Sequence, residues 1–234
     1  MDELVTSRVR LNPLGRVLYH CKQARSFRVL WMLEELGLAY ELKLLPFPPR
    51  EFARDYLAIN PLGTIPFYVE GDARMTESSM ICHLLATRCE SPKMWVDPRE
   101  PGHAAYLNFV SYGEATLTFP LAVHLRYSRL EPPARLLPQA AEDYRRFFMG
   151  RLKLIEPVLS EGPWLCGDRF TAADVSVGYA LGFANSLGLA QAFKPQVAQY
   201  LARLHARDGY LRAIAAEGGT AGGDLPFPTG AMTR

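Results

Sequence analysis

The sequence lacks an excess of charge of either sign. Its 234 residues include 26 Lys and Arg and 24 Asp and Glu, which leaves a formal net charge of +2. Nucleic-acid-binding domains usually carry a marked excess of Lys and Arg. We therefore expect no nucleic-acid partner, and the charge balance leaves room for a small neutral or anionic ligand.

Long apolar runs are missing too. Apolar stretches such as residues 29–33 are far shorter than the roughly 18 residues that cross a membrane. The chain starts Met1-Asp2-Glu3, with acids where a secretory signal carries basic residues. These features predict a cytoplasmic protein with no membrane partner.

Cysteine is scarce, and no two cysteines form a CxxC pair. Cys21, Cys82, Cys89 and Cys166 are spread over the chain without the spacing of a disulfide framework or of a zinc site. We expect four free thiols and no bound metal.

The first third of the chain alternates between strand and helix patterns. After a lead-in at residues 1–15, β-prone runs occur at 16–20, 40–44, 63–70 and 73–76. Helical patterns occupy 26–36, 50–59 and 79–89. The order β-α-β-α-β-β-α predicts an α/β domain at residues 16–90.

The rest of the chain is expected to be helical. Residues 91–101 contain Pro92, Pro98 and Pro101 and are interpreted as a linker. An all-helical domain is predicted at 102–216, with helices at 103–129, 138–159, 171–187, 195–207 and 210–216. Thr171 and Asp174 have the spacing of a capping box at a helix start. A glycine-rich flexible tail follows at 217–234.

Four segments in order make the chain resemble the glutathione S-transferase superfamily from residue 16 to about 216. They are Leu18-Tyr19-His20 with the stretch from Arg25 to Gly37, Asn60-Pro61-Leu62-Gly63-Thr64-Ile65-Pro66, Thr76-Glu77-Ser78 with Ile81, and Gly167-Asp168-Arg169-Phe170-Thr171-Ala172-Ala173-Asp174. The resemblance is to a bacterial-type member of unassigned class. It implies a thioredoxin-like domain that binds glutathione as co-substrate, a helical domain that supplies the second-substrate pocket, a homodimer and a role in detoxification.

Glutathione carries two carboxylates, an ammonium group and a thiol, and its binding site must match them. A serine hydroxyl at a helix start can hold a carboxylate, and an acid can pair with the ammonium. The resemblance implies these roles for Ser78 and Glu77, whereas spacing alone favours a helix cap at Ser78 and a helix-dipole partner at Glu77. It also implies that Pro66 is cis and turns the backbone of Ile65 toward the cysteinyl part of the peptide.

The thiol must also be activated. Lowering its pKa by about two units from about 8.5 requires roughly 2.7 kcal/mol, which a hydrogen bond of roughly 1.5 to 3 kcal/mol to the charged sulfur can supply. Ser26 at a helix start and the charge of Arg25 are the catalytic candidates, with Tyr19 and Cys21 as alternatives. In many members the catalytic hydroxyl lies slightly earlier in this loop, where Gln23 and Ala24 stand here.

Aromatic residues at helical spacing follow the linker, and in the family this helix faces the cleft. The resemblance therefore implies an electrophile pocket lined by Phe109 and Tyr112. Three functions follow. The first is transfer of glutathione to an apolar electrophile, the second is non-catalytic glutathione binding or regulation, and the third is a Cys21-based thiol reductase or peroxidase.

Overall fold

A four-stranded sheet forms the centre of the first half of the chain in the computed structural model, which describes residues 12–219. The strands β1 (Val17–His20), β2 (Glu41–Leu44), β3 (Phe67–Glu70) and β4 (Ala73–Met75) lie in the order β2-β1-β3-β4. β1 is parallel to β2 and antiparallel to β3, which is antiparallel to β4. This is the mixed sheet expected of a thioredoxin-like domain.

Three helices complete this half. They are α1 (Phe27–Glu35), α2 (Pro49–Phe52) and α3 (Ser78–Arg88). The predicted order β-α-β-α-β-β-α is confirmed, but the single helix expected at 50–59 is wrong. Ala53, with φ −137°, interrupts it, so a short α2 is followed by a 3₁₀ helix at Arg54–Ala58.

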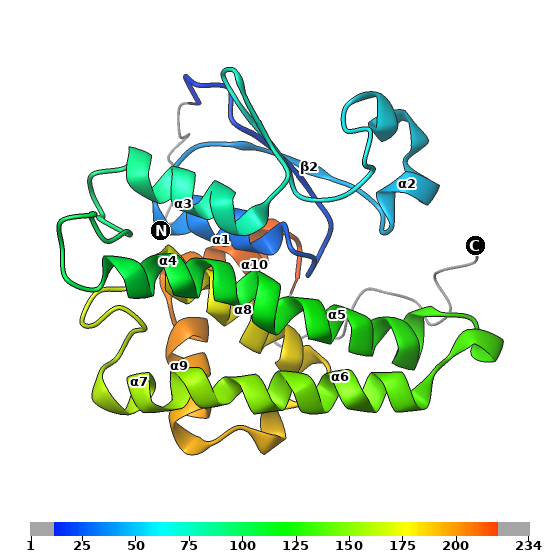
Figure 1. Cartoon of the computed structure of the whole chain (residues 1–234). Helices are drawn as coiled ribbons and strands as arrows, with labels where there is room; N and C mark the ends of the chain where they lie inside the picture. The colour runs from blue at the N-terminus through cyan, green and yellow to red at the C-terminus, as the bar shows by residue number, and fades with distance from the viewer. Residues whose placement is uncertain (1–11, 220–234) are drawn as a thin grey trace, which may run out of the picture.

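The second half is helical, as predicted. α4 (His103–Tyr112) and α5 (Phe119–Leu125) are parts of one long helix whose turns at Gly113–Thr118 and Arg126–Leu130 are π-helical. Gly113 allows this helix to approach a neighbour closely, because a Cβ at this position would lie 2.4 Å from Ser176. The long helix runs across the molecule below the sheet (Figure 1).

Five further helices follow. α6 (Pro138–Arg151) and α7 (Ile155–Glu161) are linked by a 3₁₀ turn at Leu152–Leu154, and together they run alongside α4 and α5 (Figure 1). α8 (Ala172–Ser186) packs against α4, and α9 (Pro195–His205) and α10 (Asp208–Ala216) end the described chain. No helix among residues 12–219 is both long enough and apolar enough to cross a membrane.

One apolar core joins the two halves. In α1 every residue but the last is buried, because the helix lies between the sheet side and the helical half. The Trp31 ring packs edge-on against Tyr210 at a centroid distance of 5.1 Å and lies 6.0 Å from Phe170. Gly178 of α8 makes room for it, since a Cβ there would lie 3.0 Å from the indole. The relative position of the halves is therefore set by close packing.

The end of α10 belongs to this packed body. Glu217, with which the predicted flexible tail begins, is only 1% exposed and forms the C-cap of α10. The remainder of that tail, residues 220–234, and most of the lead-in, residues 1–11, lie outside the described residues.

The predicted capping box at the start of α8 is confirmed. Asp174 is fully buried, and its Oδ2 accepts from the backbone N–H of Thr171 at 2.8 Å, while Oγ1 of Thr171 accepts from the N–H of Ala173. Oδ1 of Asp174 accepts from the N–H of Leu165 at 3.0 Å and from the hydroxyl of Tyr200 at 2.7 Å. This one carboxylate therefore ties together α8, the preceding loop and α9.

We expect Asp174→Ala to lower the free energy of unfolding by about 3 kcal/mol or more, because several buried donors lose their acceptor. Urea denaturation measures this. Asp168→Ala is the matched control: Asp168 is exposed in the same loop, and its loss should change stability by less than about 0.5 kcal/mol. Equal effects of the two variants would contradict the structural role of Asp174.

Candidate functional site

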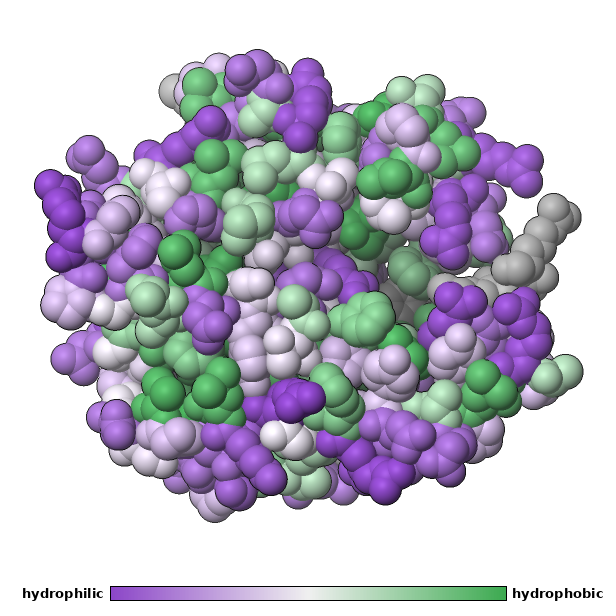
Figure 2. Space-filling view, viewed as in Figure 1, coloured by the Kyte–Doolittle hydropathy of each residue, from purple (hydrophilic) through white to green (hydrophobic). Residues whose placement is uncertain are grey.

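A cavity of about 530 Å³ opens between the two halves of the molecule. It lies between α2 and α5 and is visible as a hollow in that part of the surface (Figure 2). Its walls come from the loop before α1, the segments before β3 and α3, and the helices α5 and α8. The volume is in the range of small-molecule sites. Among the predicted site residues, Arg25, Ile65 and Glu77 line it together.

The segment before β3 presents backbone groups to the cavity. Ile65-Pro66 is a cis peptide bond, as the resemblance implied. The carbonyl of Thr64 accepts from the hydroxyl of Tyr56 at 2.7 Å and from Nδ2 of Asn60 at 2.9 Å, which holds the segment in place. Neither backbone polar group of Ile65 has a hydrogen-bond partner within residues 12–219. These groups are therefore available to a ligand with an extended backbone.

The start of α3 supplies the polar end of the cavity. Glu77 is the exposed N-cap residue of α3, and Ser78 is its first helical residue. The Oγ of Ser78 accepts a hydrogen bond of 3.2 Å from Nη1 of Arg28, so its own hydrogen remains free to be donated. Within the described chain no side chain caps α3, so Ser78 does not act as the cap that spacing alone allowed.

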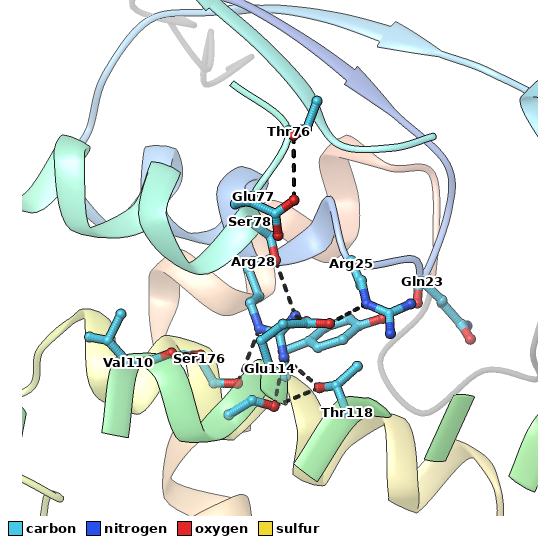
Figure 3. A network of polar contacts seen from close by, with 12 residues as sticks. Gln23, Arg25, Arg28, Thr76, Glu77, Ser78, Val110, Glu114, Thr118 and Ser176 are labelled. Carbon is cyan, nitrogen blue, oxygen red and sulfur yellow. Dashed lines mark hydrogen bonds and ion pairs between the residues drawn. The ribbon is translucent and has the colours of Figure 1, made fainter. Parts of the chain in front are cut away.

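A buried guanidinium connects this helix start to the helical half. Arg28 of α1 is fully buried and donates to groups from three other helical segments (Figure 3). Its acceptors are Oγ of Ser78, Oε2 of Glu114 at 2.5 Å, the carbonyls of Gly113 and Ser176 at 3.1 Å each, and Oγ1 of Thr118 at 2.5 Å. The guanidinium also lies 4.2 Å above the centre of the Tyr179 ring.

Sequence reasoning missed Arg28. The signal was present, because the residues that follow Arg28 up to Leu33 are all apolar, and a charged residue in such a stretch requires a buried partner. No pattern in the chain indicated that this partner would be Glu114, 86 residues away.

Glu114 holds a second arginine at the edge of the cavity. Its Oε1 accepts from Nε of Arg25 at 2.5 Å (Figure 3). Burial by itself would raise the pKa of the Glu114 carboxyl, but the charges of Arg28 and Arg25 outweigh it and hold that pKa below its usual value. The side chain of Arg25 is 36% exposed and borders the cavity, so its positive charge faces any ligand there.

Ser26, the other catalytic candidate, is not brought to the cavity. It is fully buried, and its Oγ lies 2.8 Å from Nδ1 of His20 and accepts from the N–H of Cys21 at 3.3 Å. The hydroxyl is therefore occupied on the side of the loop away from Arg25.

The two alternative activators are also placed elsewhere. Cys21 is buried, its Sγ donates to the carbonyl of Pro46 at 3.5 Å, and burial raises the pKa of its thiol to about 12. Tyr19 packs against Tyr56 and Phe67 at another hollow, beside β1.

The two residues expected to line an electrophile pocket do not line this cavity. Phe109 lies in the core and does not line the cavity, and Tyr112 borders a different hollow together with Phe147 and donates to the carbonyl of Arg151. Both residues precede the π-helical turns, which shift the phase of the long helix, so its later turns reach the cavity instead. The apolar lining consists of Ala122, Leu125, Leu130, Tyr179 and Phe183.

A metal site is not evident from side-chain positions. Within residues 12–219 no group of three or more His, Cys, Asp or Glu side chains is arranged to hold an ion. The four cysteines are free thiols.

Comparison with known proteins gives a consistent result. A profile of the family described as "Glutathione S-transferase, N-terminal domain" matches residues 24–88. Glutathione S-transferase A of Pleuronectes platessa is 29% identical over 185 residues, covering 77% of this chain and 82% of that protein. Glutathione S-transferase 3 of Schizosaccharomyces pombe is 30% identical over 176 residues, covering 68% of this chain and 69% of that protein.

The fold is similar to that of solved structures as well. A glutathione transferase from Methylococcus capsulatus superimposes with a TM-score of 0.77 at 24% identity, covering 87% of this chain and 98% of the other. This likeness extends over both halves of the molecule and agrees with the predicted combination of a thioredoxin-like domain and a helical domain.

The lowered pKa of Glu114 makes a pH-dependent prediction. Its ionised form stabilises the fold fully above the unfolded pKa of about 4.5, and this contribution is lost as pH falls through the lower pKa of the folded state. We expect Glu114→Gln to cost about 2 kcal/mol at pH 7, since two arginines lose their counter-charge. The difference from wild type should shrink as pH falls below about 4.5 and through the lower pKa of the folded-state carboxyl.

Urea unfolding at a series of pH values measures this difference. Glu161→Gln serves as the control because Glu161 is exposed at the end of α7, and its small effect should not vary with pH. A Glu114→Gln difference that stays constant through the acid range would contradict the prediction.

Proposed function

Because the chain belongs to the glutathione S-transferase superfamily, we propose that it binds glutathione in the cavity between its two halves and transfers it to an apolar electrophile. The observation that carries the proposal is the convergence of Arg25, Ile65 and Glu77 on one cavity. These residues come from three separate segments of the chain. Each matches a different chemical group of glutathione.

The backbone of glutathione is proposed to lie along Ile65. Its cysteinyl N–H and C=O would pair with the unpartnered C=O and N–H of Ile65, as an added strand pairs with a sheet edge. The ammonium of its γ-glutamyl group would pair with Glu77. The neighbouring carboxylate would accept the free hydroxyl hydrogen of Ser78 and backbone N–H groups at the start of α3.

A second carboxylate remains at the other end of the peptide. Arg50 borders the cavity from α2 and is exposed, so it is the cation proposed for this glycyl carboxylate. Sequence reasoning did not single out Arg50. Close packing between Gly63 and α2 places Arg50 at the cavity, because a Cβ at Gly63 would lie only 2.7 Å from Cβ of Arg50.

Thiol activation is assigned to Arg25 rather than to Ser26. The guanidinium lies at the start of α1, where the helix dipole adds roughly 0.3 to 1 kcal/mol of stabilisation for an anion. A charge-assisted hydrogen bond supplies roughly 1.5 to 3 kcal/mol more. Together they reach the roughly 2.7 kcal/mol that a two-unit fall in the thiol pKa requires.

The electrophile would lie against the apolar wall of Ala122, Leu125 and Phe183. The thiolate sulfur forms a bond to the electrophilic carbon, and the leaving group departs with the electron pair of its own bond. In an addition to an activated double bond, a proton from solvent goes to the adjacent carbon instead. Apolar contacts select such substrates by shape and surface rather than by hydrogen bonds.

Glutathione binding and turnover are tested first, by titration calorimetry and by conjugation of an activated aryl chloride. We expect both in the wild type, and a dissociation constant about tenfold higher for Glu77→Gln, because losing the ammonium partner costs about 1.4 kcal/mol or more. Glu90→Gln is the control, since Glu90 is exposed and far from the cavity lining. Binding of glutathione without turnover would support the non-catalytic function. Absence of glutathione binding would refute both the transferase and the non-catalytic binding function.

The activating residue is tested through the pKa of the bound thiol, followed by thiolate absorbance. Arg25→Gln should raise this pKa by about one to two units and lower kcat at neutral pH by about tenfold or more. Arg129→Gln, an exposed arginine beyond α5, is the control and should leave both values unchanged. Cys21→Ala should retain activity within about twofold, since a thiol with a pKa of about 12 is protonated at neutral pH. A disulfide reductase activity that is lost in Cys21→Ala would favour the thiol reductase instead.

A further inference from the structure

Three buried side chains join the loop before α1 to the end of α10. Oγ of Ser26 lies 2.8 Å from Nδ1 of His20, and Nε2 of the same ring lies 3.0 Å from Oε2 of Glu217. Ser26 and His20 are 0% exposed and Glu217 is 1% exposed. The chain therefore closes on itself here, because residues 20 and 217 meet across nearly its whole described length.

The three side chains form one continuous buried row. Nε2 of the His20 ring lies against the carboxylate of Glu217 and Nδ1 lies against the hydroxyl of Ser26, which also donates to the carbonyl of Cys21 at 3.4 Å. The hydroxyl oxygen also accepts from the N–H of Cys21. The order serine, histidine, acid is that of a hydrolase triad, but a serine with no exposed surface cannot reach a substrate.

The same carboxylate oxygen also holds the backbone of the loop. Oε2 of Glu217 accepts from the N–H of Gln23 at 3.0 Å, and the hydroxyl of Tyr179 donates to the carbonyl of Gln23 at 3.1 Å. Gln23 has φ +55°, the left-handed region that a residue with a side chain seldom adopts. A bond on each side of this residue, from α10 and from α8, therefore maintains an unfavourable backbone conformation.

Arg25 lies on the loop that these bonds hold. Arg25 follows Gln23 by two residues, and Figure 3 shows both on the same loop, with Arg25 directed at Glu114. Nζ of Lys22 donates to the carbonyl of Gly218 at 2.9 Å, so a second contact fastens the outer side of the loop to the same chain end.

We propose that Glu217 is a positioning residue for the reaction, which sets the conformation of residues 21–26 and thereby places Arg25 and the first N–H groups of α1 against the sulfur of glutathione. This inference rests on the proposed function. It adds that activation of the thiol requires the end of α10 to be packed against the loop before α1, whereas binding of glutathione does not. Ile65, Glu77 and Ser78 lie on other segments of the chain, so glutathione binding at these residues is expected not to depend on Glu217.

The test compares Glu217→Ala with Glu217→Gln in the full chain. Alanine removes the acceptor of both His20 and Gln23, whereas glutamine keeps an amide oxygen at the same reach. For Glu217→Ala we expect the pKa of the bound thiol to rise by about one unit and kcat at neutral pH to fall about tenfold. The dissociation constant of glutathione should stay within about twofold, and Glu217→Gln should recover most of the loss.

Asp208→Asn is the matched control, since Asp208 is an exposed acid at the opposite end of α10 and should leave kcat and thiol pKa unchanged. A folded Glu217→Ala protein with wild-type kcat and thiol pKa would overturn the inference. An equal loss of glutathione binding and of kcat would also overturn the inference, because it indicates unfolding alone. If the alanine variant does not fold, Glu217→Asp replaces it, because the shorter side chain withdraws the carboxylate from the N–H of Gln23. A raised thiol pKa and a lowered kcat with glutathione binding retained then support the inference, and wild-type values refute it.

Failure of the proposed function is distinguishable from failure of this inference. A wild type that neither binds nor conjugates glutathione refutes the function before any variant is made. A wild type that does both, combined with unaffected Glu217 variants, refutes only the positioning role.

Discussion

The buried guanidinium of Arg28 is the constraint on which the rest of the structure depends. A charge removed from water is costly unless the protein replaces its solvation, and here the fold does so with a carboxylate, two hydroxyls and two carbonyls. These acceptors come from both halves of the molecule. The two halves must therefore dock in one geometry, and the cavity forms between surfaces whose positions this network sets.

Glu114 links that structural network to the proposed chemistry. Its carboxylate accepts from Arg28 in the interior and from Arg25 at the cavity, so one acid pairs with a buried structural cation and with the cation proposed to activate the thiol. Arg25 and Ser26 are consecutive in the turn that leads into α1, and their side chains point to different sides of it. One consequently faces the cavity, and the other faces His20 and the end of α10. The loop is thus held on both sides.

Much of the fold could be predicted from local patterns. The strand and helix order of the first half, the helices of the second and the capping box of Asp174 all follow from periodicity and spacing over a few residues. The cis bond before Pro66 followed from resemblance alone. Errors arose where local signals compete with packing. Ala53 breaks the helix expected at 50–59, and the π-helical turns after Tyr112 shift which residues of the long helix reach the cavity.

By itself the sequence determined which segments form helices and strands, because these depend on residues close together along the chain. Its resemblance to a family indicated the segments expected to bind glutathione. Only the tertiary structure decided that Arg25 rather than Ser26 borders the cavity, and that Arg28 meets Glu114. It also decided that Glu217 reaches His20. These pairings join positions 86 to 197 residues apart, and the packing of α1, α8 and α10 sets them rather than any local preference.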